Sequence, residues 1–450
     1  MTTVASYPSR ARRVSARREG QRVLVVRAVF FIFLLSLLEG ALRKWFLPSL
    51  AGPLTLLRDP FVLALYAYCI SNGLIRFRGI AQLWIGFAFL TALLGLGQYI
   101  ANGYGLAGWM LGVRTYWLYM PLAFVVAETF RKEDVEKFII LNLWIAIPYA
   151  MLVAVQYSSP PTAFVNLGVG ADEEGAVQLG DGILRPFGLF TYTGPNVDYT
   201  ATIISLFMAC YIGRTIIRLR WPFLMVAGIA VASMAVLTGS RSIYFSAGAI
   251  IVVTSAGLIT SRASSRSLTN ILGILTFVAF IGLIFVSLFP DMLDAMAQRF
   301  ERAEHLEGSI WNRVLEGVFA WVDPLFNAPM LGHGIGLGAP GVASFLMVPA
   351  LSFGESDMER NLNELGLLAG LVMLGLRFGT SAWMLWIATR LAKKGHQIAL
   401  PLAGYAILPL AIGQITHSPL SAFLPWLFFG FILALLKSPN KGRPRARAQA

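Results

Sequence analysis

Long apolar runs alternate with short charged clusters from residue 23 to residue 436. A run of about 20 apolar residues spans the hydrocarbon core of a bilayer as a helix. The pattern therefore predicts an all-α, polytopic helical bundle. Twelve membrane-spanning helices are expected, at 23–41, 54–72, 80–100, 107–128, 137–157, 195–213, 221–238, 242–260, 268–289, 364–391, 398–414 and 420–436.

The connections between the predicted spans divide the chain into five segments. These are a basic tail at 1–22, the first nine spans at 23–289 with a loop at 158–195, a large second loop at 290–363, the last three spans at 364–436 and a basic tail at 437–450. Loops of this length without repeats are usually functional or disordered. Aromatic residues and Gly-Pro turns in both loops favour ordered structure.

Lysine and arginine are concentrated in alternate connections between the predicted spans. With twelve spans, 25 of the 36 Lys and Arg side chains fall on one face of the membrane, which includes both tails. The positive-inside rule makes this face cytoplasmic. We therefore expect a multi-pass membrane protein with both termini in the cytoplasm and the two long loops on the opposite side.

The net charge of +13 belongs mainly to these short clusters beside the membrane. Such clusters orient spans and contact anionic headgroups, and the sequence holds no compact basic domain, so nucleic-acid binding is not expected. Cys69 and Cys210 both lie inside predicted spans, which excludes a disulfide framework. The four histidines match no metal-binding spacing, and we expect no metal or other cofactor.

Eleven cations do not follow the charge rule, because they lie in spans or on the opposite face. They are Arg43, Lys44, Arg58, Arg114, Arg185, Arg241, Arg299, Arg302, Arg313, Arg360 and Arg377. Each can pair with a carboxylate or extend to lipid headgroups, and a guanidinium also suits phosphate oxygens. Acids nearby in the sequence favour ion pairs or headgroup contacts for Arg43, Lys44, Arg58, Arg299 and Arg302. An anionic ligand, most simply a pyrophosphate, is favoured for Arg114, Arg185 and Arg241.

Acidic residues gather just before the tenth predicted span, at Glu355, Asp357, Glu359 and Glu364, around Arg360. One carboxylate of such a cluster at the membrane surface can act as a general base. The acids can equally stabilise a helix N-terminus or pair with Arg360 or Arg313.

The run from Gly332 to Gly338 alternates glycine with other residues and includes His333. Its backbone N–H groups can bind an anion, or the run can form a tightly packed turn. His333 and His417 are both expected on the outer face, where a base or a phosphate contact is conceivable.

Four short motifs follow one another between about residues 180 and 380. They are Arg185-Pro186-Phe187-Gly188-Leu189-Phe190 followed by Gly194-Pro195-Asn196, then Leu237-Thr238-Gly239-Ser240-Arg241, then Arg313 with the stretch 329–336, and Asn361…Glu364-Leu365-Gly366-Leu367-Leu368-Ala369-Gly370. In this order they resemble the O-antigen ligase and O-antigen polymerase superfamily.

The resemblance implies a lipid-dependent glycosyltransferase of the bacterial inner membrane. Such an enzyme takes a glycan from undecaprenyl pyrophosphate on the periplasmic face and joins it to another glycan or to a lipid core. An inverting mechanism without a metal is implied, in which a base activates the acceptor hydroxyl and fixed arginines stabilise the leaving pyrophosphate. The resemblance places Arg185 and Arg241 on the pyrophosphate. Arg114 and Arg313 are expected beside them, with Arg360 and Glu364 nearby.

One departure concerns the base. Ligases of this family carry a His-Asn pair about nine residues before the glutamate equivalent to Glu364, and this chain has Glu355-Ser356 there. Either Glu355 replaces the histidine as the base, or His333 is the base, or this branch has lost or altered the chemistry. The missing histidine favours a polymerase over a ligase. A transporter or flippase of a lipid-linked or anionic solute is the alternative, disfavoured because the charges gather at one face instead of mid-membrane.

Overall fold

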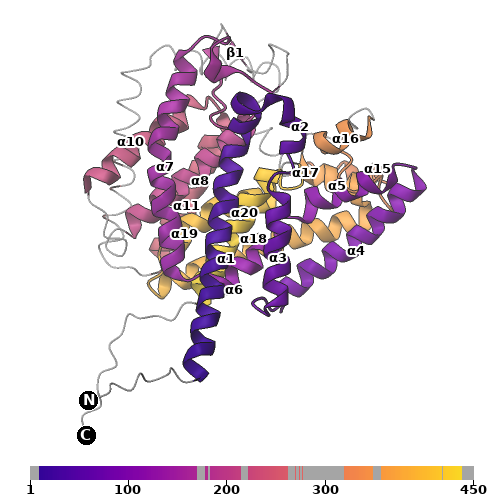
Figure 1. Ribbon diagram of the computed structural model, residues 1–450, viewed down its shortest axis with the longest axis horizontal. Helices are drawn as coiled ribbons and strands as arrows, with labels where there is room; N and C mark the ends of the chain where they lie inside the picture. Colours follow the sequence, from indigo (N-terminus) through magenta and orange to yellow (C-terminus); the bar gives the residue numbers. More distant parts are fainter. Residues whose placement is uncertain are drawn as a thin grey trace, which may run out of the picture.

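The computed structural model describes residues 10–169, 178–180, 183–213, 221–261, 319–347, 356–417 and 419–437, with the single positions 269, 273 and 276. These parts are helical apart from one small hairpin (Figure 1). The helices are α1 (Arg10–Ala41), η1 (Leu42–Phe46), η2 (Pro48–Leu50), α2 (Ala51–Leu54), α3 (Asp59–Ser71), α4 (Ile80–Ala101), α5 (Gly105–Trp117), α6 (Met120–Thr129), α7 (Lys132–Ser158), η3 (Phe164–Asn166), α8 (Thr193–Ile212), α10 (Trp221–Leu237), α11 (Arg241–Thr260), α15 (Pro324–Asn327), α16 (Pro340–Leu346), α17 (Asp357–Leu365), α18 (Leu367–Lys393), α19 (Ala399–Ala411) and α20 (Pro419–Lys437). The strands are β1 (Gln178–Gly180) and β2 (Ile183–Leu184), paired antiparallel.

Several helices are long and apolar enough to cross a membrane, so the chain is a helical membrane protein. Among the described residues there are seven, or eight if the bent pair α5 and α6 forms one span. They are Ala16–Phe46, Pro48–Ser71, Ile80–Ala101, Lys132–Ser158, Arg241–Thr260, Leu367–Lys393 and Leu420–Lys437. Helices α10 and α19 are apolar but shorter. Most of the predicted span at 268–289 and half of the loop at 290–363 lie outside the described residues.

Ion pairs bring the first and last helices to the same end of the bundle. Arg22 of α1 binds the carboxylate of Asp134 at the start of α7. Lys437, the last residue of α20, lies 2.6 Å from Glu128 in α6. Because Glu128 and Asp134 flank the short α6–α7 connection, the two ends of the described chain meet at one end of the bundle.

Helix α20 occupies the centre of the bundle. Its apolar window is 83% buried, against 22–50% for the other candidate spans, so protein surrounds it on nearly all sides. Phe423 packs on Phe33 of α1, and Phe431 packs on Phe138 of α7 at a ring-centroid distance of 4.9 Å. Trp426 stacks edge-on against Trp84 of α4.

Two predicted spans are broken where they were expected to be continuous. The fourth, at 107–128, bends by 45° between α5 and α6, where Pro121 lacks the N–H that a continuous helix requires. The tenth was expected to begin at Glu364 but begins at Leu367. Gly366 has a φ of +85°, which ends α17 and turns the chain into α18. Glu364 therefore belongs to the short helix α17, outside the span.

Candidate functional site

A cavity of about 1130 Å³ opens at one end of the bundle. Its wall is formed by the C-terminal end of α1, by α2 and the turn after it, by α5, by the segment leading into α8, by α16 and by His417. Glu39 in this wall lies 17 residues after Arg22 in α1, which is about 25 Å along a helix axis. This distance approaches the thickness of a hydrocarbon core. The cavity is therefore at the end of the bundle opposite the two terminal segments.

Three arginines line this cavity, and two carboxylates hold them in place. Arg58 Nε lies 2.6 Å from Glu39 Oε2, and Arg43 Nη1 lies 3.8 Å from Glu39 Oε1. Arg114 binds Asp59 and donates to the carbonyl of Thr55 at 2.8 Å. We refer to Arg43, Arg58 and Arg114 below as the arginine triad.

The arginine triad carries one more positive charge than the two carboxylates balance. Arg58 is only 5% exposed, and its guanidinium carbon lies 5.7 Å from the centre of the Tyr119 ring. Its Nη1 atom is buried without a hydrogen-bond partner among the described residues. Buried guanidinium donors are costly when they are unsatisfied, so this group is suited to an anion held in the cavity.

The cavity brings together only part of the predicted pyrophosphate site. Arg114 lines it, as the ligand prediction requires, although it also forms an ion pair that the sequence did not suggest. The described cavity wall includes neither Arg185 nor Arg241. Arg313 lies outside the described residues. The predicted ion pairs of Arg43 and Arg58 are confirmed, and both residues line the cavity.

Lys44 was expected to find a carboxylate or lipid headgroups, and this prediction is wrong. The side chain is 4% exposed and its Nζ donates to the carbonyl of Gly188 at 2.9 Å. The ammonium also lies 4.0 Å from the centre of the Phe187 ring, a cation–π distance. Lys44, in η1 directly after α1, thus attaches this part of the chain to the loop that contains Arg185.

The glycine run binds an anion that the protein itself supplies, the side chain of Glu364. The backbone N–H of Gly336 donates to Glu364 Oε2 at 2.8 Å, and that of Gly338 donates to Oε1 at 2.6 Å. The Tyr116 hydroxyl donates to Oε2 at 2.6 Å. The run is also a tightly packed turn, since a Cβ on Gly332 would collide with the backbone of Glu364. The structure thus shows the packed turn, and the N–H groups of Gly336 and Gly338 are occupied by Glu364 and not by a ligand.

Burial and hydrogen bonding act in opposite directions on Glu364. The side chain is 2% exposed, and burial raises the pKa of its carboxyl from 4.5 to about 7, although the three donors lower it. The carboxyl group therefore changes protonation near neutral pH. Glu364 does not line the described cavity wall, so its contacts fix the glycine run against α5 and α17.

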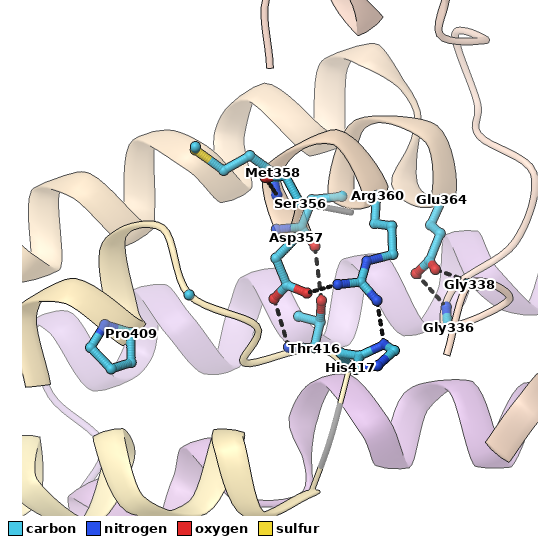
Figure 2. A network of polar contacts seen from close by, with 12 residues as sticks. Gly336, Gly338, Ser356, Asp357, Met358, Arg360, Glu364, Pro409, Thr416 and His417 are labelled. Carbon is cyan, nitrogen blue, oxygen red and sulfur yellow. Dashed lines mark hydrogen bonds and ion pairs between the residues drawn. The ribbon is translucent and has the colours of Figure 1, made fainter. Parts of the chain in front are cut away.

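A second buried network lies beside the cavity, around Asp357 of α17 (Figure 2). Asp357 Oδ1 is 3.0 Å from Arg360 Nη2, and Oδ2 is 3.4 Å from Arg377 Nη1. The backbone N–H of Thr416 donates to Oδ2 at 2.8 Å. Asp357 therefore serves as an ion-pair partner, one of the roles predicted for the acidic cluster. Glu355, the candidate base in the same cluster, lies outside the described residues.

The two histidines expected on the outer face have different surroundings. His417 lines the cavity, and its Nδ1 contacts Nη1 of Arg360 (Figure 2). His333 is exposed and is absent from the described cavity wall. Its backbone N–H donates to the carbonyl of Asn363 at 2.9 Å, which holds the glycine run to α17.

The described residues contain no group of three or more His, Cys, Asp or Glu side chains that could hold a metal ion. Comparisons with protein-family models, with curated proteins and with solved structures each returned no match. The fold and the site together define a helical membrane protein with a cationic cavity at one end of its bundle.

Sequence reasoning missed the roles of Arg43 and Arg58 in the cavity wall. It assigned both to ion pairs because acids were close in the chain, and an ion pair does not prevent an arginine from also facing a ligand. One signal was present. Charged residues gather around the junction of the first two predicted spans: Glu39, Arg43, Lys44, Arg58 and Asp59.

Proposed function

We propose that this protein is a membrane glycosyltransferase that polymerises or ligates a surface polysaccharide. Its donor is a glycan linked to undecaprenyl pyrophosphate, and its acceptor is another glycan or a lipid core. The site faces the periplasm in the bacterial inner membrane, with both termini cytoplasmic. The observation that carries this proposal is the arginine triad. It lines one cavity, at the end of the bundle opposite Arg22 of α1 and the last residue of α20.

The charge and shape of the cavity suit a diphosphate with a lipid tail. The arginine triad supplies an excess of positive charge, and guanidinium forks match phosphate oxygens in geometry. Glu39 and Asp59 hold these forks in place before a ligand binds, which limits the ordering cost of binding. Leucine and phenylalanine side chains line other parts of the wall, where an isoprenoid chain would lie: Leu56, Leu111, Phe345 and Leu420.

The volume of about 1130 Å³ is slightly larger than that of ordinary small-molecule pockets, which reach about 1000 Å³. It accommodates a diphosphate together with the first sugar of a glycan. In the proposed reaction an acceptor oxygen attacks the anomeric carbon, and the bond from that carbon to the diphosphate oxygen breaks. The electron pair leaves with the diphosphate, whose growing charge the arginine triad stabilises. A base takes the acceptor proton, and Glu355 and His333 stay the predicted candidates.

Reconstitution with an undecaprenyl-pyrophosphate-linked oligosaccharide tests the proposal. We expect a longer or transferred glycan, and we expect Arg58→Gln to remove most of this product because it deletes a fixed positive charge. The family resemblance further predicts that Arg241→Ala abolishes product while the protein stays folded and inserted. Glu355→Gln should remove the glycan product if Glu355 is the base. If Glu355 only caps a helix, the amide should be tolerated and the product should remain. Absence of glycan product from the wild-type protein would contradict the proposal.

A transporter or flippase is the second candidate, and the break between α5 and α6 favours it. Discontinuous membrane helices form the substrate sites of many transporters. The same reconstitution distinguishes the two functions. Movement of the lipid-linked oligosaccharide across the bilayer without bond formation would indicate transport.

A further inference from the structure

His417 belongs both to the cavity wall and to the buried network around Asp357. It lies in the connection between α19 and α20. Figure 2 shows its ring against the guanidinium of Arg360, which reaches it from α17. A single histidine therefore joins a buried ionic network to the proposed ligand site.

The contact with Arg360 fixes the tautomer of His417. A guanidinium carries five N–H donors and no acceptor, so Nδ1 of His417 must accept the hydrogen bond. In a neutral imidazole the proton then lies on Nε2. The described residues provide no hydrogen-bond partner for Nε2.

The surroundings of His417 keep the ring neutral. Burial and the positive charge of Arg360 lower its pKa, and Asp357 opposes them. Arg377 faces the same network from α18, and the arginine triad stands on the same cavity wall. Cations therefore outnumber carboxylates around the ring.

The network behind His417 holds it in position from two directions. Asp357 binds Arg360, which contacts the ring, and also accepts from the N–H of Thr416, the residue before His417. Asp357 and Arg377 have fully buried side chains. Buried ion networks are weak contributors to stability compared with apolar packing, so positioning accounts better for their presence beside a cavity.

We infer that His417 binds the diphosphate as a hydrogen-bond donor through Nε2–H, with Arg360 as its positioning residue, and that it is not the general base. This inference rests on the proposed function, which supplies the diphosphate. The Nε2–H group suits an anionic phosphate oxygen. The only lone pair of the neutral ring lies on Nδ1, where Arg360 occupies it, so the ring cannot take a proton from an acceptor hydroxyl.

Two substitutions test whether His417 acts as a hydrogen-bond donor to the diphosphate or as a base. His417→Gln places an amide N–H near the position of Nε2, and His417→Leu keeps the bulk without a donor. We expect the leucine variant to bind undecaprenyl pyrophosphate on the order of 10- to 100-fold more weakly than wild type, in line with a lost hydrogen bond to a charged group. The glutamine variant should retain most of the affinity. His396→Gln, far from the cavity, should bind as wild type does.

Binding is measured with undecaprenyl pyrophosphate and the full chain in lipid nanodiscs. Wild-type affinity in His417→Leu, or equal weakness in the leucine and glutamine variants, would overturn the inference. Nitrogen-15 NMR of histidine-labelled protein gives an independent readout, with the His417 signal assigned by its loss in His417→Gln. The wild type should show an Nε2–H ring, and Arg360→Gln should shift it towards the Nδ1–H tautomer. An Nδ1–H ring in the wild type would contradict the inference.

The failure of this inference is distinguishable from failure of the proposed function. Binding that Arg58→Gln weakens and His417→Leu leaves intact would overturn the role of His417 alone. Undetectable binding by the wild-type protein would overturn the proposed function and the inference with it.

Discussion

Glu364 is a buried carboxylate whose hydrogen-bond partners are all donors. Tyr116 and the backbone N–H groups of Gly336 and Gly338 converge on its two oxygens. Each of these donors would lose a partner if the acceptor were removed. The side chain therefore connects three segments that are distant in the sequence, namely α5, the glycine run and α17.

Glu364→Gln should destabilise the fold by about 1–3 kcal/mol, because the amide N–H₂ places donors against donors. The measurement is the midpoint of thermal unfolding in detergent or nanodiscs. Glu128→Gln is the matched control, since Glu128 forms only a partly exposed pair with Lys437 and such pairs contribute little. Equal midpoints for both variants would show that the three donors do not depend on the carboxylate.

The raised pKa of Glu364 predicts a pH dependence of stability. Between pH 4.5 and about 7 the folded protein binds this proton more tightly than the unfolded chain does. The contribution of Glu364 to the free energy of unfolding is therefore largest at acidic pH and is lost as pH rises through about 7. We expect the stability advantage of wild type over Glu364→Gln to be larger at pH 5 than at pH 8. An advantage that grows with pH would mean that the three donors outweigh burial.

The ion pairs of the buried arginines could be predicted from the sequence only in part. Acids nearby in the sequence predicted an ion pair or headgroup contact for Arg43 and Arg58, and Arg43 pairs with Glu39 one helical turn away. The partner of Arg58 is also Glu39, in α1, which the sequence did not single out. The pairs Arg114–Asp59 and Arg377–Asp357 join different helices. Their partners depend on packing that a single sequence does not reveal. For the same reason the cavity wall could not be assembled from the charge pattern.

Among the elements, the apolar runs predicted most described helices to within a few residues, because hydrophobic length is a strong signal. The breaks were harder to predict. Gly366 ends α17 with φ +85° and ψ 166°, a conformation open almost only to glycine. A glycine within an apolar run has no sequence feature that distinguishes such a break from an ordinary helical position. The β1–β2 hairpin was likewise not predicted.

Gly366→Ala should therefore be destabilising, by about 1–3 kcal/mol from backbone conformation alone. A Cβ there would also collide with backbone atoms at Met330 and Leu331. Gly375→Ala in the same segment is the matched control, since its Cβ meets nothing within 4 Å. Alanine is the better helix former, so this variant should equal or exceed wild type in stability. Comparable thermal midpoints for the two variants would contradict the assigned role of Gly366.

For the whole molecule, the pattern of apolar runs correctly predicted a helical membrane protein. Residues 128–134 contact both α1 and the end of α20, which places both terminal helices at one end, as an even number of spans requires. The described helices that qualify as spans number seven or eight. Twelve spans and the cytoplasmic orientation stay predictions, because length and composition alone do not place the shorter helices α10 and α19 relative to a bilayer.

Cysteine accessibility tests this topology. In a chain whose two native cysteines are replaced, Thr162→Cys lies after α7 and should react with a membrane-impermeant maleimide in intact spheroplasts. Ser71→Cys lies at the end of α3, beside the basic connection, and should react only after lysis. Both positions are exposed, so a difference in labelling reports the side of the membrane. Labelling of both positions, or only of Ser71→Cys, before lysis would contradict the predicted orientation.

The central claim is that the arginine triad binds a diphosphate, and direct binding tests it most simply. Undecaprenyl pyrophosphate is titrated against the full chain in nanodiscs for wild type, Arg58→Gln and the control Arg390→Gln. Arg390 is exposed at the opposite end of the bundle, stacked on Trp386. We expect Arg58→Gln to bind at least on the order of tenfold more weakly, as loss of a charge-assisted hydrogen bond implies, and Arg390→Gln to match wild type. Equal affinities for all three proteins would contradict the claim.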